Sequence, residues 1–225
     1  MSSPGLTPPL RLPHGTWPRC RCFGISIPKR ALPLGEEGML TAASQELRVK
    51  WKNIDVGAAY YYITATFTEW LPLLNRQDIR LIICDEIARS LVECGGSLSA
   101  YVLMPDHLHL AVYLPEHGLL HRFNKLWRGR SARRIAVLLE SQGDSAALEL
   151  MARHANGGTR YAVWKEQVPA LAIWNEPKLN AMVNYIHGNP VRRGLVEAPG
   201  EWRFSSWRAY EQGEDGLLEV VPPAL

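Results

Sequence analysis

The stretch "YVLMPDHLHLAVYLP", residues 101–115, places two histidines one residue apart inside an apolar run. Apolar segments lie on both sides of a central Pro-Asp pair, which is typical of two antiparallel strands joined by a tight turn. On a strand, residues i and i+2 point to the same face, so His107 and His109 would converge while Leu108 faces the opposite layer. On a helix the same spacing would send the two rings to opposite sides. The strand interpretation therefore predicts a joint site.

The segments before this hairpin predict one strand and one helix. Residues 59–70, "AYYYITATFTEW", are rich in aromatic and β-branched residues and predict a first strand. Residues 78–94 carry apolar side chains at helical spacing, with Asp78 as the expected N-cap. We expect the glycine pair Gly95 and Gly96 to end this helix.

The segments after the hairpin complete the pattern. Residues 118–140 predict an amphipathic basic helix that is kinked or frayed at Gly129, and residues 161–174 predict a last strand. A trailing helix begins at Asn175 as N-cap and stops at Pro190. The order of strands and helices indicates an α+β fold, in which a ferredoxin-like antiparallel sheet is covered by helices on one face.

Length and composition are those of an ordinary globular protein. The 225 residues carry a net charge of +3, with 47% hydrophobic and 21% charged residues. This length suits one domain with extensions. We expect a flexible Pro/Arg-rich extension over 1–45, a catalytic domain over 46–212 with an insertion loop at 141–160, and a C-terminal tail over 213–225.

Cysteine usage and hydropathy predict a cytoplasmic protein. Cys20 and Cys22 are too close for a two-residue zinc knuckle, and Cys84 and Cys94 lie far from them, so we expect four reduced thiols. Apolar runs are broken by charges well before the ~20 residues that a membrane span needs. Residues 1–20 lack the apolar core of a secretory signal. We therefore expect no contact with a membrane.

Basic residues are unevenly distributed and form two clusters. Such a run is usually a solvated helix face, and contact with a nucleic-acid backbone is the alternative. The near absence of acidic partners before Glu140 favours DNA contact for the first cluster. Trp202 and Trp207 lie beside the second cluster and suit either base stacking or the core. The basic residues that we expect to contact DNA are Arg122, Lys125, Arg128, Arg130, Arg133, Arg134, Arg192 and Arg193.

The histidine pair alone does not decide its own role. Two imidazoles on one strand face can hold a divalent metal ion, leaving positions for a third ligand, water and substrate oxygens. The alternative is one hydrogen-bonded core histidine and one solvated histidine, which is the commoner fate of isolated histidines. Because so short a spacing recurs by chance, the metal hypothesis needs support from elsewhere in the chain.

That support comes from segments at 104–109 ("MPDHLH"), 185–186 ("YI"), 189–195 ("NPVRRGL") and 202–210 ("WRFSSWRAY"). Together these segments resemble the single-tyrosine HUH transposases of insertion sequences, and most closely the REP-associated tyrosine transposases. The resemblance runs from about residue 50 to residue 210. The segment before the tyrosine helix departs from the family pattern, keeping Trp164 but little else.

The resemblance implies a ferredoxin-like sheet, a Mg²⁺ or Mn²⁺ ion bound by His107 and His109, and Tyr185 as the nucleophile. Asn189 is either a third metal ligand or a cap of the tyrosine helix. We expect His187 to be solvated or to contact phosphate. The implied partner is single-stranded or hairpin DNA, the implied location is cytoplasmic and nucleoid-associated, and a homodimer could place the tyrosine in cis or in trans.

The implied activity is that of a metal-dependent DNA endonuclease and strand transferase with a 5′-phosphotyrosyl intermediate. One alternative is a protein that binds hairpin DNA without cutting it. A second alternative is an unrelated metallohydrolase, in which the histidines bind zinc and water attacks. That alternative leaves Tyr185 idle and the basic helix unexplained. For Tyr185 itself, the alternative to a nucleophile is an ordinary core tyrosine.

Overall fold

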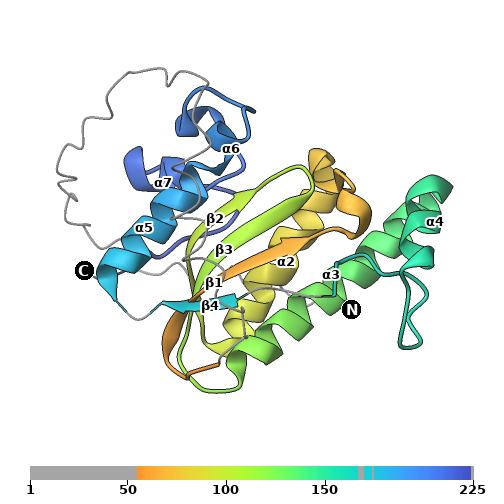
Figure 1. The fold of residues 1–225 in the computed structure, drawn as a ribbon, viewed down its shortest axis with the longest axis horizontal. Coiled ribbons are helices and arrows are strands. Elements are labelled where there is room, and N and C mark those ends of the chain that lie inside the picture. The colour runs from red at the N-terminus through yellow and green to blue at the C-terminus, as the bar shows by residue number, and fades with distance from the viewer. Residues whose placement is uncertain (1–54, 167–169, 174, 224–225) are drawn as a thin grey trace, which may run out of the picture. The chain divides into compact units, whose positions relative to one another are not determined.

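A computed structural model describes residues 55–166, 170–173 and 175–223, and Figure 1 shows their arrangement. The expected extension over residues 1–45, with Cys20 and Cys22, lies outside the described residues. Cys84 and Cys94 are buried free thiols. None of the helices in the described part of the chain is long and apolar enough to cross a membrane.

The sheet has four strands: β1 (Ala59–Thr66), β2 (Ser97–Leu103), β3 (His107–Leu114) and β4 (Ala170–Ile173). Their order is β2-β3-β1-β4, and every neighbouring pair is antiparallel. The first long helix lies between β1 and β2 in the sequence, and the second long helix precedes β4. This is the ferredoxin-like arrangement that the sequence predicts.

Helices cover both faces of the sheet. Two long helices pack on one face, and α5 packs against β2 and β3 on the other (Figure 1). The expectation of helices on a single face is therefore wrong, because the trailing helix returns across the second face. The helices are α2 (Gln77–Cys94), α3 (Leu119–Ser141), α4 (Ser145–Arg153), α5 (Glu176–His187), α6 (Asn189–Arg192) and α7 (Trp207–Glu211).

Two predicted helix ends are confirmed, whereas the predicted N-cap of α2 and the predicted break at Gly129 are wrong. Gly95 takes the left-handed conformation that ends α2, and the Asn175 side chain accepts a hydrogen bond from Lys178 N–H as N-cap of α5. The N-cap of α2 is Arg76, while Asp78 lies in the first turn and pairs with the Arg76 side chain. Helix α3 runs through Gly129 without a break.

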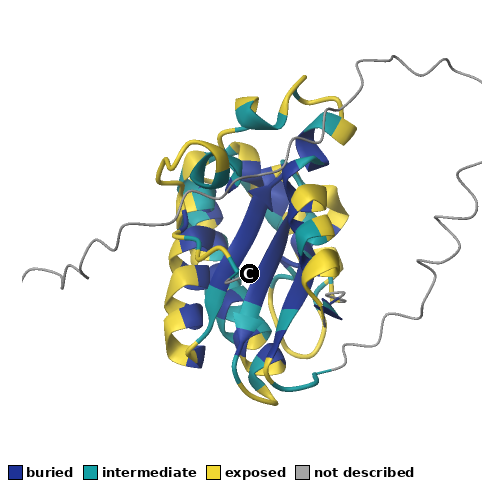
Figure 2. Cartoon of the chain, turned by 90° about the vertical axis from the view of Figure 1, so that its left-hand side faces the viewer, coloured by how far each residue is buried: buried dark blue, intermediate teal, exposed yellow. Residues whose placement is uncertain are grey.

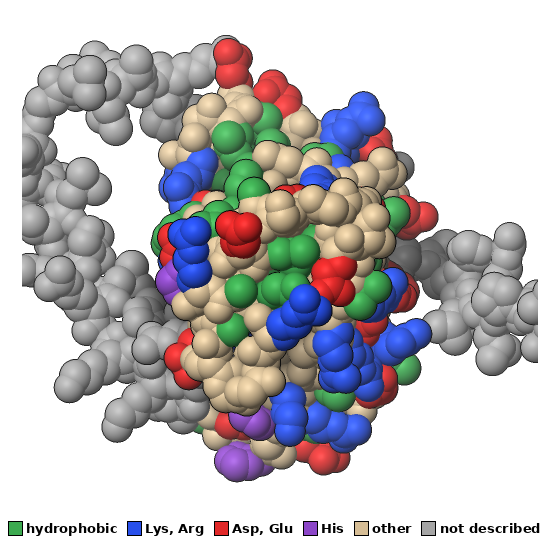
Figure 3. All heavy atoms as spheres, turned by 90° about the vertical axis from the view of Figure 1, so that its right-hand side faces the viewer, with side chains coloured by type: hydrophobic (Ala, Val, Ile, Leu, Met, Phe, Trp, Pro, Cys, Tyr) green, Lys and Arg blue, Asp and Glu red, His purple; other side chains and the backbone are tan. Residues whose placement is uncertain are grey.

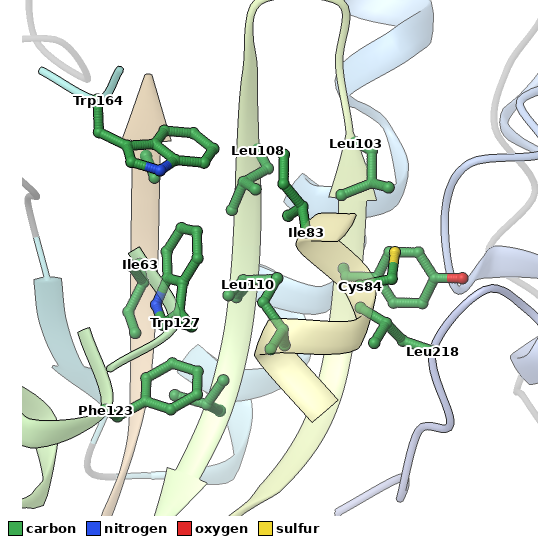
Figure 4. Packing of buried hydrophobic residues seen from close by; sticks show 14 of the residues in the cluster. Ile63, Ile83, Cys84, Leu103, Leu108, Leu110, Phe123, Trp127, Trp164 and Leu218 are labelled. Atoms are coloured by element: carbon green, nitrogen blue, oxygen red, sulfur yellow. The ribbon is translucent and has the colours of Figure 1, made fainter. Parts of the chain in front are cut away.

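The main core lies between the sheet and the pair α2 and α3 (Figure 4). Leu108 and Leu110 of β3 are fully buried there against Ile83 of α2 and Trp127 of α3. Figure 2 shows the buried strands lying between helices whose outer faces are exposed. Because side chains alternate along β3, His107 and His109 point to the α5 side, opposite to these leucines.

The C-terminal segment is hydrogen-bonded to β2. Leu103 N–H donates to Phe204 C=O at 2.8 Å, and Val221 N–H donates to Leu98 C=O at 2.8 Å. Leu218 is buried in the main core. Residues 202–221 therefore pack along β2, which is the edge strand of the sheet, and this packing continues past the segment 202–210.

Candidate functional site

The two histidines lie side by side on the α5 face of β3. Their ring centroids are 4.9 Å apart, and both side chains are buried, with 5% and 6% exposure for His107 and His109. They pair across the strand with Thr66 and Thr64 of β1. The strand periodicity thus brings the two imidazoles together as predicted.

Each imidazole has its Nδ1 atom occupied by a neighbouring side chain. Asp106 Oδ1 lies 2.5 Å from His107 Nδ1, while His109 Nδ1 lies 2.8 Å from Tyr62 Oη and 2.9 Å from Thr64 Oγ1. Partners of this kind fix the ring orientation and leave Nε2 to ligate. A metal ion at this pair would therefore bind through the Nε2 atoms, and metal binding stays a prediction.

Burial favours the neutral form of both rings. It lowers the pKa of His107, against the opposing effect of Asp106, and lowers the pKa of His109 to about 3. The charges of Arg192 and Arg193, and that of His107 whenever it is protonated, add to this effect at His109. A metal ion binds the neutral form of imidazole, so the two residues present fit a divalent cation.

Tyr185 lies near the C-terminal end of α5 and faces the histidine pair of the same chain. Its ring centroid is 6.0 Å from that of His109 and 6.0 Å from that of Tyr62. The Arg192 guanidinium carbon lies 4.0 Å from the Tyr185 ring centroid, and the guanidinium donates a hydrogen bond to the Tyr185 carbonyl oxygen. With 44% of its surface exposed, Tyr185 can be reached by a large substrate.

Asn189 is buried beside the tyrosine helix. Its Nδ2 donates to the Tyr185 carbonyl oxygen at 3.3 Å, so the amide nitrogen caps α5. A metal ion would instead bind the amide oxygen, and the role of third ligand stays a prediction. Within the described residues no group of three or more His, Cys, Asp or Glu side chains could hold a metal. Remaining ligands would have to be amide, water or substrate oxygens.

Tyr62 and Thr64 belong to the site, although the sequence analysis did not single them out. Both project from β1 toward His109 because residues i and i+2 of a strand share a face. Burial raises the pKa of Tyr62, whose side chain is only 8% exposed. Of the two tyrosines beside the histidines, Tyr185 is therefore the accessible one. Alternation along residues 60–64 places Tyr62 and Thr64 on one face, but only the register of β1 against β3 shows that this face meets His109.

The basic residues of α3 lie on the other side of the sheet from the histidines. Arg130 binds Glu93 of α2 at 2.6 Å, and Arg134 binds Asp85 and Glu86 of the same helix. Figure 3, which views the molecule from the end where α4 lies, shows Lys and Arg side chains beside Asp and Glu. The expectation that this cluster lacks acidic partners is wrong, because the neighbouring helix supplies them.

The rest of this cluster differs in its surroundings. Arg128 donates to the Lys165 carbonyl oxygen, and burial lowers the pKa of Arg128 to about 10. Within the described ranges, no ion pair forms at Arg122, Lys125 or Arg133. DNA contact by α3 stays a prediction, one that the position across the sheet disfavours. Arg192 and Arg193 are exposed beside the histidine pair.

His187 and the two tryptophans have structural roles. His187 is buried, its Nε2 lies 2.8 Å from Ser206 Oγ, and burial lowers its pKa to about 4, so the expectation of a solvated or phosphate-binding residue is wrong. Trp202 Nε1 donates to the Leu103 carbonyl oxygen at 3.0 Å. Trp207 packs so closely on Gly200 that a Cβ there would lie 2.6 Å from its ring.

An open pocket adjoins the site next to His107. Residues from the end of β1, from the β2–β3 turn and from the segment after α6 meet there. The pocket is lined by Trp70, Pro72, Met104, Pro105, Asp106, His107, Arg193 and Leu195. A ligand bound here would touch one imidazole and an exposed arginine.

The arrangement of sheet and helices matches a solved structure. A REP-associated tyrosine transposase bound to a REP hairpin superposes with a TM-score of 0.51, covering 76% of this chain and 91% of that chain. The chain has a tyrosine-transposase fold. At 17% identity this likeness establishes the tyrosine-transposase fold and nothing about activity.

A second solved structure gives a weaker match. It is a provisionally assigned transposase from Deinococcus radiodurans R1, with 20% identity, a TM-score of 0.38, and coverage of 61% of this chain and 94% of that chain. A TM-score this low does not establish a shared fold. No protein-family model matches the sequence, and a search of curated proteins finds no match.

Proposed function

We propose that this protein is a divalent-metal-dependent, single-tyrosine DNA endonuclease and strand transferase that acts on single-stranded or hairpin DNA. The observation that carries the proposal is the proximity of Tyr185 to two neutral histidines, with ring centroids 6.0 Å apart for Tyr185 and His109. The hairpin bound to the structure of similar fold supports the choice of substrate.

In the proposed reaction, the Tyr185 phenolate oxygen attacks the phosphorus of a DNA phosphodiester. A P–O bond to tyrosine forms, the P–O3′ bond breaks, and the 3′ oxygen leaves and takes a proton. The product is a 5′-phosphotyrosyl link with a free 3′-hydroxyl. Because the bond energy is kept, the reverse attack by that hydroxyl, or by another, rejoins DNA without a nucleotide cofactor.

The neighbours of Tyr185 support this assignment. The Arg192 guanidinium over the ring would stabilise the developing phenolate and hold the side chain in place. Tyr62 is a poorer nucleophile because it is buried and its hydroxyl is engaged by His109. Tyr185 is therefore the tyrosine from which we expect the covalent link.

His107 and His109 would hold Mg²⁺ or Mn²⁺ through their Nε2 atoms, with the Asn189 amide oxygen as a further candidate ligand. A bound divalent ion supplies Lewis-acid polarisation of the phosphate and lowers the cost of forming a phenolate. Imidazole is softer than the oxygen ligands that Mg²⁺ prefers, so we expect Mn²⁺ to support the higher activity.

Incubation of the protein with a labelled hairpin oligonucleotide and Mn²⁺ tests the proposal. We expect a protein–DNA adduct that survives denaturation, and none from the Tyr185→Phe variant. An adduct formed by Tyr185→Phe would refute the nucleophile. Cleavage by the wild type without any adduct would show a hydrolase in which water attacks, and tight binding without cleavage would show a hairpin-binding protein.

A further inference from the structure

Trp70 is a large exposed aromatic residue at the edge of the proposed active site. It ends the short 3-10 turn Thr68–Trp70 that follows β1, and 52% of its surface is exposed. It lines the same open pocket as His107 and Arg193. An indole exposed to this extent gains little from burial, so its contribution to folding does not explain its position.

The backbone at this turn is strained. Glu69 has φ 54° and ψ 21°, and Trp70 has φ 55°, so two consecutive residues other than glycine adopt the left-handed region. Residues other than glycine rarely adopt this region, and they do so as single residues and not in succession. Strain of this kind persists only where the surroundings hold it, and it is concentrated at ligand-binding sites.

Neighbouring elements hold this turn in place. Glu69 Oε1 lies 2.7 Å from His154 Nε2 at the end of α4, and Trp70 N–H donates to Phe67 C=O at 3.1 Å. Trp164 stacks on Phe67 with ring centroids 4.3 Å apart and an interplanar angle of 16°. These contacts fix the backbone that carries the Trp70 indole, which lowers the entropic cost of ligand binding.

One face of the indole carries a cation. Lys165 Nζ lies 3.9 Å from the Trp70 ring centroid, and Lys165 N–H donates to Thr66 C=O at 2.9 Å, which anchors this lysine to the end of β1. With the ammonium on one face and half of the side chain exposed, the remaining surface is available for stacking. Arg193 adds a second exposed positive charge at the pocket.

We infer that Trp70 is the stacking platform for an unpaired nucleobase next to the scissile phosphate, with Lys165 and Arg193 contacting the adjoining phosphates. The inference rests on the proposed function, because it takes the histidine pair as the place of the phosphate. Stacking of a base on an aromatic side chain strengthens binding about tenfold and tolerates any base, because every base has a π-face. Trp70 would then select single-stranded over paired DNA at this position.

The test measures binding of hairpin oligonucleotides with mixed-sequence single-stranded flanks by fluorescence anisotropy, using the full chain. One abasic nucleotide is moved along the flank. For the wild type we expect one position at which loss of the base weakens binding about tenfold. Trp70→Ala should weaken binding of the intact oligonucleotide by a similar factor and become insensitive to that position, while Trp70→Phe should retain most of the affinity.

Thermal unfolding of the variants guards against misfolding, and the abasic scan of the wild type needs no variant. A wild type that forms the covalent adduct but shows no sensitive abasic position, with Trp70→Ala binding equally well, would overturn the inference and leave the proposed function standing. A sensitive position that disappears in Trp70→Ala, without any adduct from the wild type, would support Trp70 as the platform and refute the nucleophile. A wild type that binds no DNA would overturn both.

Discussion

Replacing Arg134 by alanine tests whether the basic helix α3 is held by α2 or is free to bind DNA. Glu86 is 2% exposed, its Oε1 lies 2.7 Å from Arg134 Nη1, and its Oε2 has no hydrogen-bond partner among the described residues. Removing one partner of a buried ion pair costs roughly 3–5 kcal/mol. Because the Arg134 side chain is 45% exposed, we expect the lower end, about 3 kcal/mol of unfolding free energy.

Urea denaturation followed by tryptophan fluorescence measures this loss, and Arg133→Ala is the matched control. Arg133 is exposed on the same helix and forms no ion pair within the described residues, so its replacement should change stability by less than about 0.5 kcal/mol. The reasoning is refuted if Arg134→Ala is as stable as the wild type while it weakens hairpin binding and flattens the salt dependence of that binding.

Two further predictions concern the site and its support. On going from pH 7.5 to pH 5, the buried His187 should lower the free energy of unfolding by about 2 kcal/mol, because an unfolded histidine takes up a proton near pH 6.5 and the folded one only near its pKa of about 4. Urea denaturation at both pH values should show that His187→Gln loses about 2 kcal/mol less unfolding free energy than the wild type. Equal losses in the two proteins would contradict the assignment. Arg192→Ala should slow adduct formation about fivefold at saturating DNA, since a cation over an aromatic ring contributes about 1 kcal/mol; an unchanged rate would show that the guanidinium does not act on Tyr185.

The sequence predicted those features that depend on local periodicity. Alternation along residues 107–114 was sufficient to place both histidines on one face and Leu108 in the core. Gly95 and Asn175 are positioned by short-range backbone geometry, so their capping roles were also predictable.

The features that the sequence analysis missed depend on contacts between distant segments. Counting charges within α3 overlooked Glu93, which reaches Arg130 from another helix. His187 is buried because the segment after α6 returns to β2 and brings Ser206 to it. Tyr62 joins the site through the register of β1 against β3, and the strain at Trp70 is a property of the folded backbone. None of these contacts leaves a periodic signal in the chain.

The most direct measurement is the identification of the residue that carries DNA after the reaction with Mn²⁺. Protease digestion of the adduct, nuclease trimming of the DNA and tandem mass spectrometry would locate the nucleotide remnant. The account predicts a phosphodiester-linked remnant on Tyr185 alone. A remnant on Tyr62, or a cleaved oligonucleotide with no remnant on any tyrosine, would contradict it.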